Sequence, residues 1–146
     1  MIRLDNTSEQ SIITMLRDNN VLNIDQIKQI ETLSKESGKS QLETAFELNI
    51  TNDSKIAKLL SESFSIPLVS LEQVKITKGL KKYTELSYLK DNTIIPFAIE
   101  GEIIKVAIPD ASKLSLLKNI HSLTKLEPEL YAASLKDIGK FIIRLD

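Results

Sequence analysis

Chemistry at a phosphate would need a glycine-rich loop that closes on Lys and Ser or Thr. Residues 38–40 read Gly-Lys-Ser, which is the end of such a loop. The glycine that should stand five residues earlier is Leu33, and the three other glycines, Gly79, Gly101 and Gly139, do not have the required spacing either. The sequence therefore predicts no phosphate-binding loop of an ATPase.

The remaining residue types that catalyse reactions or bind metals are few. His121 is the one histidine and cysteine is absent, so neither a His-based triad nor a thiolate metal site has its parts. Asp110 stands before an apolar helical pattern, where a carboxylate is explained by helix capping. We expect a histidine at a surface or helix end, a capping Asp110, and no catalytic residue, metal or cofactor.

The charged residues are balanced, with 19 Lys and Arg against 20 Asp and Glu. The small cluster of Lys78, Lys81 and Lys82 is typical of the solvated side of a short helix. Two tyrosines on the same short helices, Tyr83 and Tyr88, are expected to pack on their own domain. Without a longer basic run we expect no nucleic-acid partner.

The hydropathy pattern argues against a signal peptide and against a membrane span. Neither the N-terminal residues nor any other stretch has the continuous apolar run of a signal peptide or a membrane span, so we expect no direct membrane insertion. The lack of cysteine fits a reducing compartment, and a cytoplasmic location is expected. Residues 141–146 still read as helix without a terminating Gly or Pro, which suggests a fragment of a longer protein.

An internal repeat organises residues 1–66. Residues 15–33 and 44–62 carry the same apolar pattern at an offset of 29 residues, with Asn20 and Asn49 breaking the helix at the same place. We predict four helices in two hairpins. The first begins near Thr7 or Ser8, the second is capped by Asn23 and closed by Gly38, the third spans 40–48 and ends at Asn49, and the fourth follows a Thr51 cap and stops before Pro67.

A different pattern begins at residue 67. An extended piece at 68–71 and two short helices at 77–83 and 84–90, each opened by a Thr, are predicted before strands at 93–99 and 102–108. Glu100-Gly101 is a hairpin turn, and Pro96 indicates an edge or a bulge. A helix capped by Asp110 or Ser112, a strand near 128–132 and a last helix capped by Ser134 complete a ββαβα unit.

We therefore predict an α+β fold in which a helical repeat subdomain, residues 1–66, precedes an α/β subdomain, residues 67–146. Helices are expected on one face of the small sheet. Residues 68–74 join the two differently patterned halves and are the expected hinge, and a close-packed pair of halves is the alternative.

The order of these motifs resembles a known family. Phe64-Ser65-Ile66-Pro67-Leu68-Val69, then Ile94-Ile95-Pro96-Phe97, then Glu100-Gly101 before residues 104–110, look like the N-terminal domain of the assembly ATPases of type II secretion and type IV pili. Leu123-Thr124 also fits, with Lys125 in a position where the family has Gly. The resemblance implies a non-catalytic docking module that binds an inner-membrane platform component or the ATPase motor domain and is peripheral to the membrane through such partners.

Some members of this family, the MshEN domains, bind cyclic di-GMP through both hairpins. The resemblance assigns the nucleotide-motif positions to Ser11, Asn20 and Ser34 in the first copy and to Ser40, Asn49 and Ser63 in the second. The family has Arg, Gly and Gln there, so the guanidinium donors and the glycine backbone are both lost. We expect protein docking and no cyclic di-GMP binding; the alternatives are a cyclic di-GMP receptor with a divergent site and a scaffold unrelated to secretion.

Overall fold

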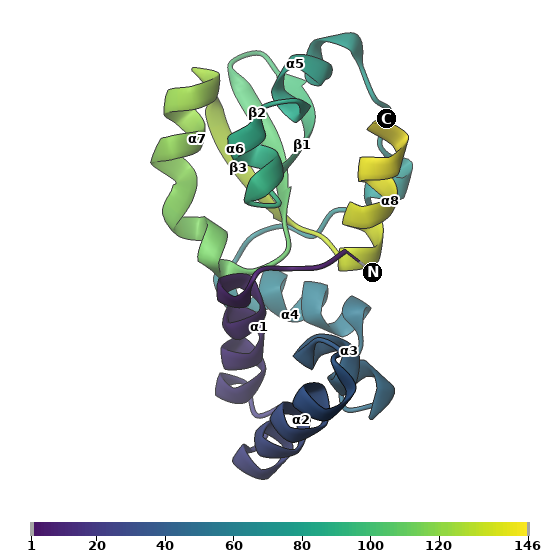
Figure 1. The fold of residues 1–146 in the computed structure, drawn as a ribbon. Coiled ribbons are helices and arrows are strands. Elements are labelled where there is room, and N and C mark those ends of the chain that lie inside the picture. Colours follow the sequence, from purple (N-terminus) through teal and green to yellow (C-terminus); the bar gives the residue numbers. More distant parts are fainter. Residues whose placement is uncertain (1, 146) are drawn as a thin grey trace.

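The computed structural model describes residues 2–145. Figure 1 shows a helical part below a small sheet flanked by helices. The helical part contains α1 (Asn6–Asp18), α2 (Ile24–Ser37), α3 (Gln41–Glu47) and α4 (Asp53–Phe64). The α+β fold class predicted from the sequence is confirmed.

The two helical hairpins repeat each other in their backbone hydrogen bonds. Val21 N donates to Leu16 O at 2.8 Å in the first copy, and Ile50 N donates to Ala45 O at 3.2 Å in the second. The predicted duplication is therefore present as a structural repeat, in which each apolar face is buried against its neighbour.

Two helix boundaries follow the sequence prediction closely. Asn23 caps α2 by accepting a hydrogen bond from Gln26 N at 2.8 Å, while Gln26 Oε1 accepts one from Asn23 N at 3.0 Å. Gly38 ends the same helix in the left-handed conformation with φ of 74°. This is the conformation that glycine adopts at little steric cost.

Two other N-caps were predicted at the wrong residue. α1 is capped by Asp5, whose Oδ1 accepts from Ser8 N at 2.8 Å, so the helix begins earlier than Thr7. α4 is capped by Asn52, while Thr51 is buried and is 4% exposed. In each case several residues able to cap stand side by side, and packing selects among them.

The sheet contains β1 (Ile95–Glu100), β2 (Ile103–Ile108) and β3 (Glu127–Ala132) in the order β1-β2-β3. β1 and β2 are antiparallel and joined through Gly101, whereas β2 and β3 are parallel. Pro96 lies in the edge strand, next to an irregularity in register between Pro96 and Ala98. Both readings of this proline, an edge and a bulge, are confirmed.

Helices cover both faces of the sheet, which corrects the prediction of a single covered face. α7 (Leu117–Thr124) and α6 (Ser87–Asp91) lie on one side, and α8 (Leu135–Leu145) lies on the other (Figure 1). The reason is visible in β2, where Val106, Ala107 and Ile108 are consecutive and all fully buried. Neighbouring strand residues point to opposite faces, so each face needs a cover.

The connecting segments are short elements. η1 (Leu71–Gln73), η2 (Lys78–Leu80) and α5 (Lys81–Thr84) precede α6, and η3 (Ala111–Leu116) precedes α7. Thr77 stands before η2 without a side-chain cap, and Thr84 ends α5 instead of opening a helix, because its hydroxyl donates to Lys81 O at 2.9 Å. Asp110 caps η3 through Ser112 N at 2.9 Å, and Ser134 accepts from Asp137 N at 3.1 Å at the start of α8.

The two halves share one hydrophobic core. One buried cluster includes Ile12 and Leu60 from the hairpins together with Ile108 and Ala132 from the sheet. Of residues 68–71, predicted to be extended, Leu68 and Val69 run beside β3, where Val69 N donates to Ala132 O at 2.9 Å, whereas Leu71 begins η1. Among the described residues, no helix combines the length and the apolar character needed to cross a membrane.

Candidate functional site

The two motif starts lie next to each other. Glu9 Oε1 accepts a hydrogen bond from Gln41 N at 3.1 Å, which places the α1 segment containing Ser11 beside the start of α3. Ser40 is the N-cap of α3 and accepts from Glu43 N at 3.1 Å. The first α3 amides thus already bind a carboxylate and a hydroxyl, so an anion approaching this helix end meets the negative charge of Glu9.

The two motif asparagines keep the backbone shape that glycine would give. Asn20 has φ of 62° and Asn49 has φ of 57°, both in the left-handed region, and both side chains are exposed. Asn is one of the residues that tolerates this region. Asn20 also lines a shallow cavity of about 610 Å³ together with Arg17.

The two closing positions differ from each other. Ser34 Oγ donates to Lys39 O at 2.6 Å and helps to close α2. In the second copy the corresponding bond comes from Ser61, whose Oγ donates to Ile66 O at 2.5 Å, and Ser63 is exposed. α4 is two residues shorter than α2, at 12 residues against 14, which shifts Ser63 out of the matching position.

Other residues singled out by type serve structural roles. Lys39, next to Gly38, pairs with Glu47 at 2.5 Å, and this hydrogen bond raises the pKa of Lys39. His121 is exposed near the end of α7, with Nδ1 2.9 Å from the carbonyl oxygen of Leu126. Asp110 is 1% exposed and caps η3 through Oδ1. The expected positions, a histidine at a helix end and a capping Asp110, are confirmed.

The lysines around α5 face solvent, as expected. Lys78, Lys81 and Lys82 are exposed, and Lys82 Nζ lies 4.9 Å from the centre of the Tyr83 ring. Tyr83 and Tyr88 are half-buried against the main core, as expected, and Tyr88 Oη accepts from Asn119 Nδ2 at 2.7 Å.

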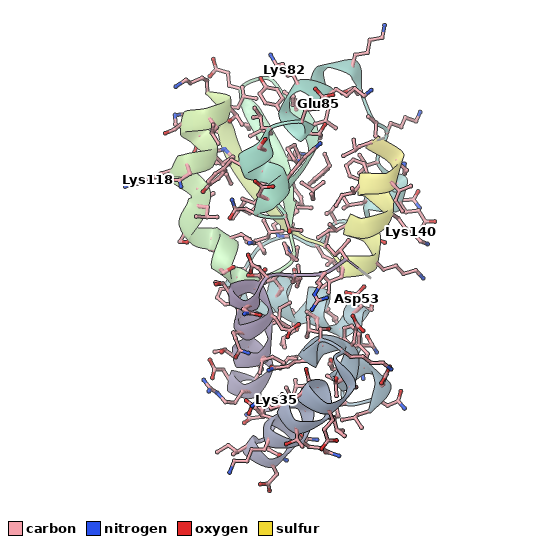
Figure 2. The ribbon with its side chains drawn as sticks, in the orientation of Figure 1. Lys35, Asp53, Lys82, Glu85, Lys118 and Lys140 are labelled. Atoms are coloured by element: carbon pink, nitrogen blue, oxygen red, sulfur yellow. The ribbon has the colours of Figure 1, made fainter. Side chains whose placement is uncertain are left out.

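One apolar groove of the structure was not found from the sequence. A groove of about 650 Å³ runs between α8 and the helical hairpins. It is lined by residues from the N-terminal segment, α3, α4 and α8: Ile2, Phe46, Asp53, Leu135, Lys136, Gly139, Lys140, Ile142 and Ile143. Figure 2 shows Asp53 and Lys140 at this side of the molecule, where α4 approaches α8. One residue of the sequence could have indicated the groove. Ile143 lies outside the buried face of α8 formed by Ile138 and Phe141, and it is 73% exposed.

Asp53 holds the two sides of the groove together. Its Oδ1 accepts from Leu135 N at 2.7 Å and its Oδ2 accepts from Lys136 N at 2.8 Å. A carboxylate of α4 therefore caps α8 through both oxygens. The helix dipole of α8 also stabilises a negative charge at this end. Asp137 of α8 in turn accepts from Leu71 N at 3.1 Å.

The structure combines a duplicated helical hairpin with a three-stranded sheet that helices cover on both faces, and an apolar groove runs beside α8. The model of the MshEN domain family matches residues 64–146. The chain belongs to the MshEN domain family and is an N-terminal domain of the kind found in type II secretion and type IV pilus ATPases.

Three proteins similar to this chain are described by name. The type IV pilus assembly ATPase PilB of Thermus thermophilus is 27% identical over 118 residues, which is 80% of this chain and 13% of PilB. The structure of MshE with cdg has a TM-score of 0.65 at 15% identity, covering 92% of this chain and 98% of that one. The N-terminal domain of XpsE has a TM-score of 0.59 at 20% identity, covering 97% and 98%. The two structures establish the fold, and the chain spans about an eighth of the length of the pilus ATPase.

Proposed function

We propose that this chain is the docking and regulatory domain of a cytoplasmic secretion or pilus assembly ATPase. In this role it binds a component of the inner-membrane platform or the motor domain of its own protein. The observation that carries the proposal is the pairing of an intact MshEN fold with motif positions that serve its own helices, as Ser34 and Ser40 do. A fold that persists while its ligand side chains are lost is expected where the repeats serve packing and protein contact.

Electrostatics at the hairpins supports this proposal over nucleotide binding. The motif positions lack the two arginines of the family, and Glu9 occupies the first amide of α3. A dinucleotide phosphate needs cationic or free amide donors, which these groups do not provide.

A pairwise binding experiment tests the docking role. The purified chain is titrated by calorimetry with the cytoplasmic part of the platform protein encoded beside its parent gene, and separately with the parent motor domain. Saturable binding to one of them is expected. Failure to bind either one at roughly 100 μM, a concentration above the Kd of most transient complexes, contradicts the proposal.

One observation favours a second candidate, a cyclic di-GMP receptor with a divergent site. Asn20 and Asn49 keep the left-handed backbone, and Arg17 lies at the cavity beside Asn20. A titration of the chain with cyclic di-GMP, with ATP and GTP as controls, separates the candidates. Saturable binding heat at micromolar cyclic di-GMP supports the receptor if Arg17→Ala abolishes it. If no binding heat is seen, docking remains the proposed function.

A further inference from the structure

The groove beside α8 has apolar walls from both halves of the chain. Phe46 comes from α3, Ile142 and Ile143 come from α8, and Ile2 comes from the N-terminal segment. Gly139 allows this arrangement, because a Cβ at that position would lie 3.1 Å from Ile2 Cγ2. The N-terminal segment can therefore lie against α8 and form a wall of the groove.

The polar rim of the groove is cationic. Lys136, Lys140 and Ile143 follow each other at spacings of four and three residues and share one outward stripe of α8. Both lysines are exposed, and neither forms an ion pair within residues 2–145. The carboxylate of Asp53 accepts hydrogen bonds from the amides of Leu135 and Lys136. Its negative charge is therefore balanced by the start of α8 and not by the two lysines.

We propose that this groove binds an amphipathic helix of a partner protein whose apolar stripe is flanked by acidic residues. The proposal rests on the docking function above and names the chemistry of the docking partner. An apolar stripe on such a helix would pack against Phe46, Ile142 and Ile143, and its carboxylates would lie beside Lys136 and Lys140. The charge complementarity argues for an acidic partner, and the concave apolar floor argues for a helix.

Strand addition is the other common mode of peptide binding, and the sheet disfavours it. β1 is one edge, and there Pro96 cannot donate a ladder hydrogen bond and the register is irregular. The other edge, β3, is already bridged by Leu68. A partner helix in the groove of α8 is therefore the mode that the exposed surfaces fit.

The test uses the 146-residue chain labelled with ¹⁵N and two synthetic helical peptides of about 18 residues, roughly 27 Å of helix. The peptides share one Leu stripe and differ in having Glu or Lys beside it. We expect the Glu peptide to shift the amide signals of α8 and of Phe46, and to bind more tightly than the Lys peptide. Lys136→Glu combined with Lys140→Glu should weaken the Glu peptide about tenfold and reverse the preference.

Matched variants control for nonspecific binding. Ile143→Ser should weaken the Glu peptide about tenfold, whereas Ile24→Ser, which changes an isoleucine 65% exposed on α2, should leave it unchanged. Lys118→Glu is the charge control, since Figure 2 shows Lys118 on the opposite side of the molecule from Lys140. Equal effects of the groove variants and their controls would overturn the proposal.

Other occupants give different results in the same set of variants. Binding of anionic vesicles that needs Lys136 and Lys140, with no peptide shifts in the groove, would mean a membrane surface and overturn the proposal. A dimer that Ile143→Ser dissociates would mean a second copy, with the same consequence. If a platform or motor component binds and the groove variants do not change its affinity, this inference fails while the docking function stands. If the Glu peptide binds the groove but neither component binds the chain, the docking function alone fails.

Discussion

Asp53→Ala tests whether the carboxylate of α4 fixes α8. The substitution removes two charge-assisted hydrogen bonds, at 2.7 Å to Leu135 N and at 2.8 Å to Lys136 N. A helix cap contributes about 0.5 to 2 kcal/mol, and a carboxylate at a helix start adds about 0.3 to 1 kcal/mol through the dipole. Because Lys136 is exposed and water can replace one partner, we expect a loss of about 2 kcal/mol in the free energy of unfolding.

The assay is urea unfolding followed by circular dichroism, with the urea slope compared between variants. At about 2 to 4 °C per kcal/mol for a domain of this size, Asp53→Ala should lower the melting temperature by roughly 4 to 8 °C. Asp53→Asn keeps one acceptor oxygen and loses the charge, so about half of that loss is expected. Hydrogen exchange at the amides of Leu135 and Lys136 should become faster in both variants.

Asp25→Ala is the matched control, because Asp25 lies in the first turn of α2 as Asp53 lies in the first turn of α4. It should cost about 0.3 to 1 kcal/mol, the contribution of a carboxylate to its own helix alone. Equal losses for Asp53→Ala and Asp25→Ala would refute the reasoning, since the cap on α8 would then contribute nothing.

Three further predictions concern other contacts. The hydrogen bond from Ser8 N lowers the pKa of Asp5, so its stabilisation is complete above the ordinary value of 3.8 and is lost as the pH falls through the lower folded pKa. Asp5→Asn should therefore flatten the loss of stability between about pH 5 and pH 2 in urea titrations, and an unchanged slope would contradict this. Asn20→Ala should cost about 1 kcal/mol in thermal unfolding because of its positive φ, whereas Asn20→Gly should stay within about 0.5 kcal/mol of the parent; equal costs would argue against the left-handed backbone. Arg144 donates to the carbonyl oxygens of Leu71 at 3.1 Å and Val74 at 2.5 Å, so Arg144→Ala should cost about 1 kcal/mol and speed hydrogen exchange at residues 71–74, with Arg144→Lys intermediate; unchanged exchange there would refute the contact.

Local signals predicted most of the fold. The repeat, the end of the third helix near Asn49, the hairpin at Gly101 and the edge position of Pro96 each depend on residues close in sequence. N-cap residues were harder to predict where two residues able to cap are neighbours, as Thr51 and Asn52 are. Capping propensity ranks such residues nearly equally. Tertiary packing then decided which of them caps.

Contacts between distant residues account for what was missed. The cap of α8 by Asp53 joins residues 82 positions apart, and no local pattern distinguishes it from a carboxylate that serves its own helix. The groove likewise needs Phe46 and Ile143 to meet through the fold. The second helix layer on the sheet, in contrast, had a readable signal in the consecutive apolar residues Val106, Ala107 and Ile108.

The same contacts couple the second hairpin to the proposed docking groove. Asp53 is the first residue of α4, and its carboxylate holds the start of α8, whose outward stripe carries Lys136 and Lys140. A partner that moved α8 away from α4 would have to break that cap and expose part of the core shared by the two halves. The cap alone would cost about 2 kcal/mol, which is at least as much as the two exposed ion pairs of the rim return at about 0 to 1 kcal/mol each, and the exposed core adds to that cost. Binding in the groove is therefore expected to leave α4 and α8 in place, so that a force applied to α8 by a bound partner reaches the helical hairpins directly.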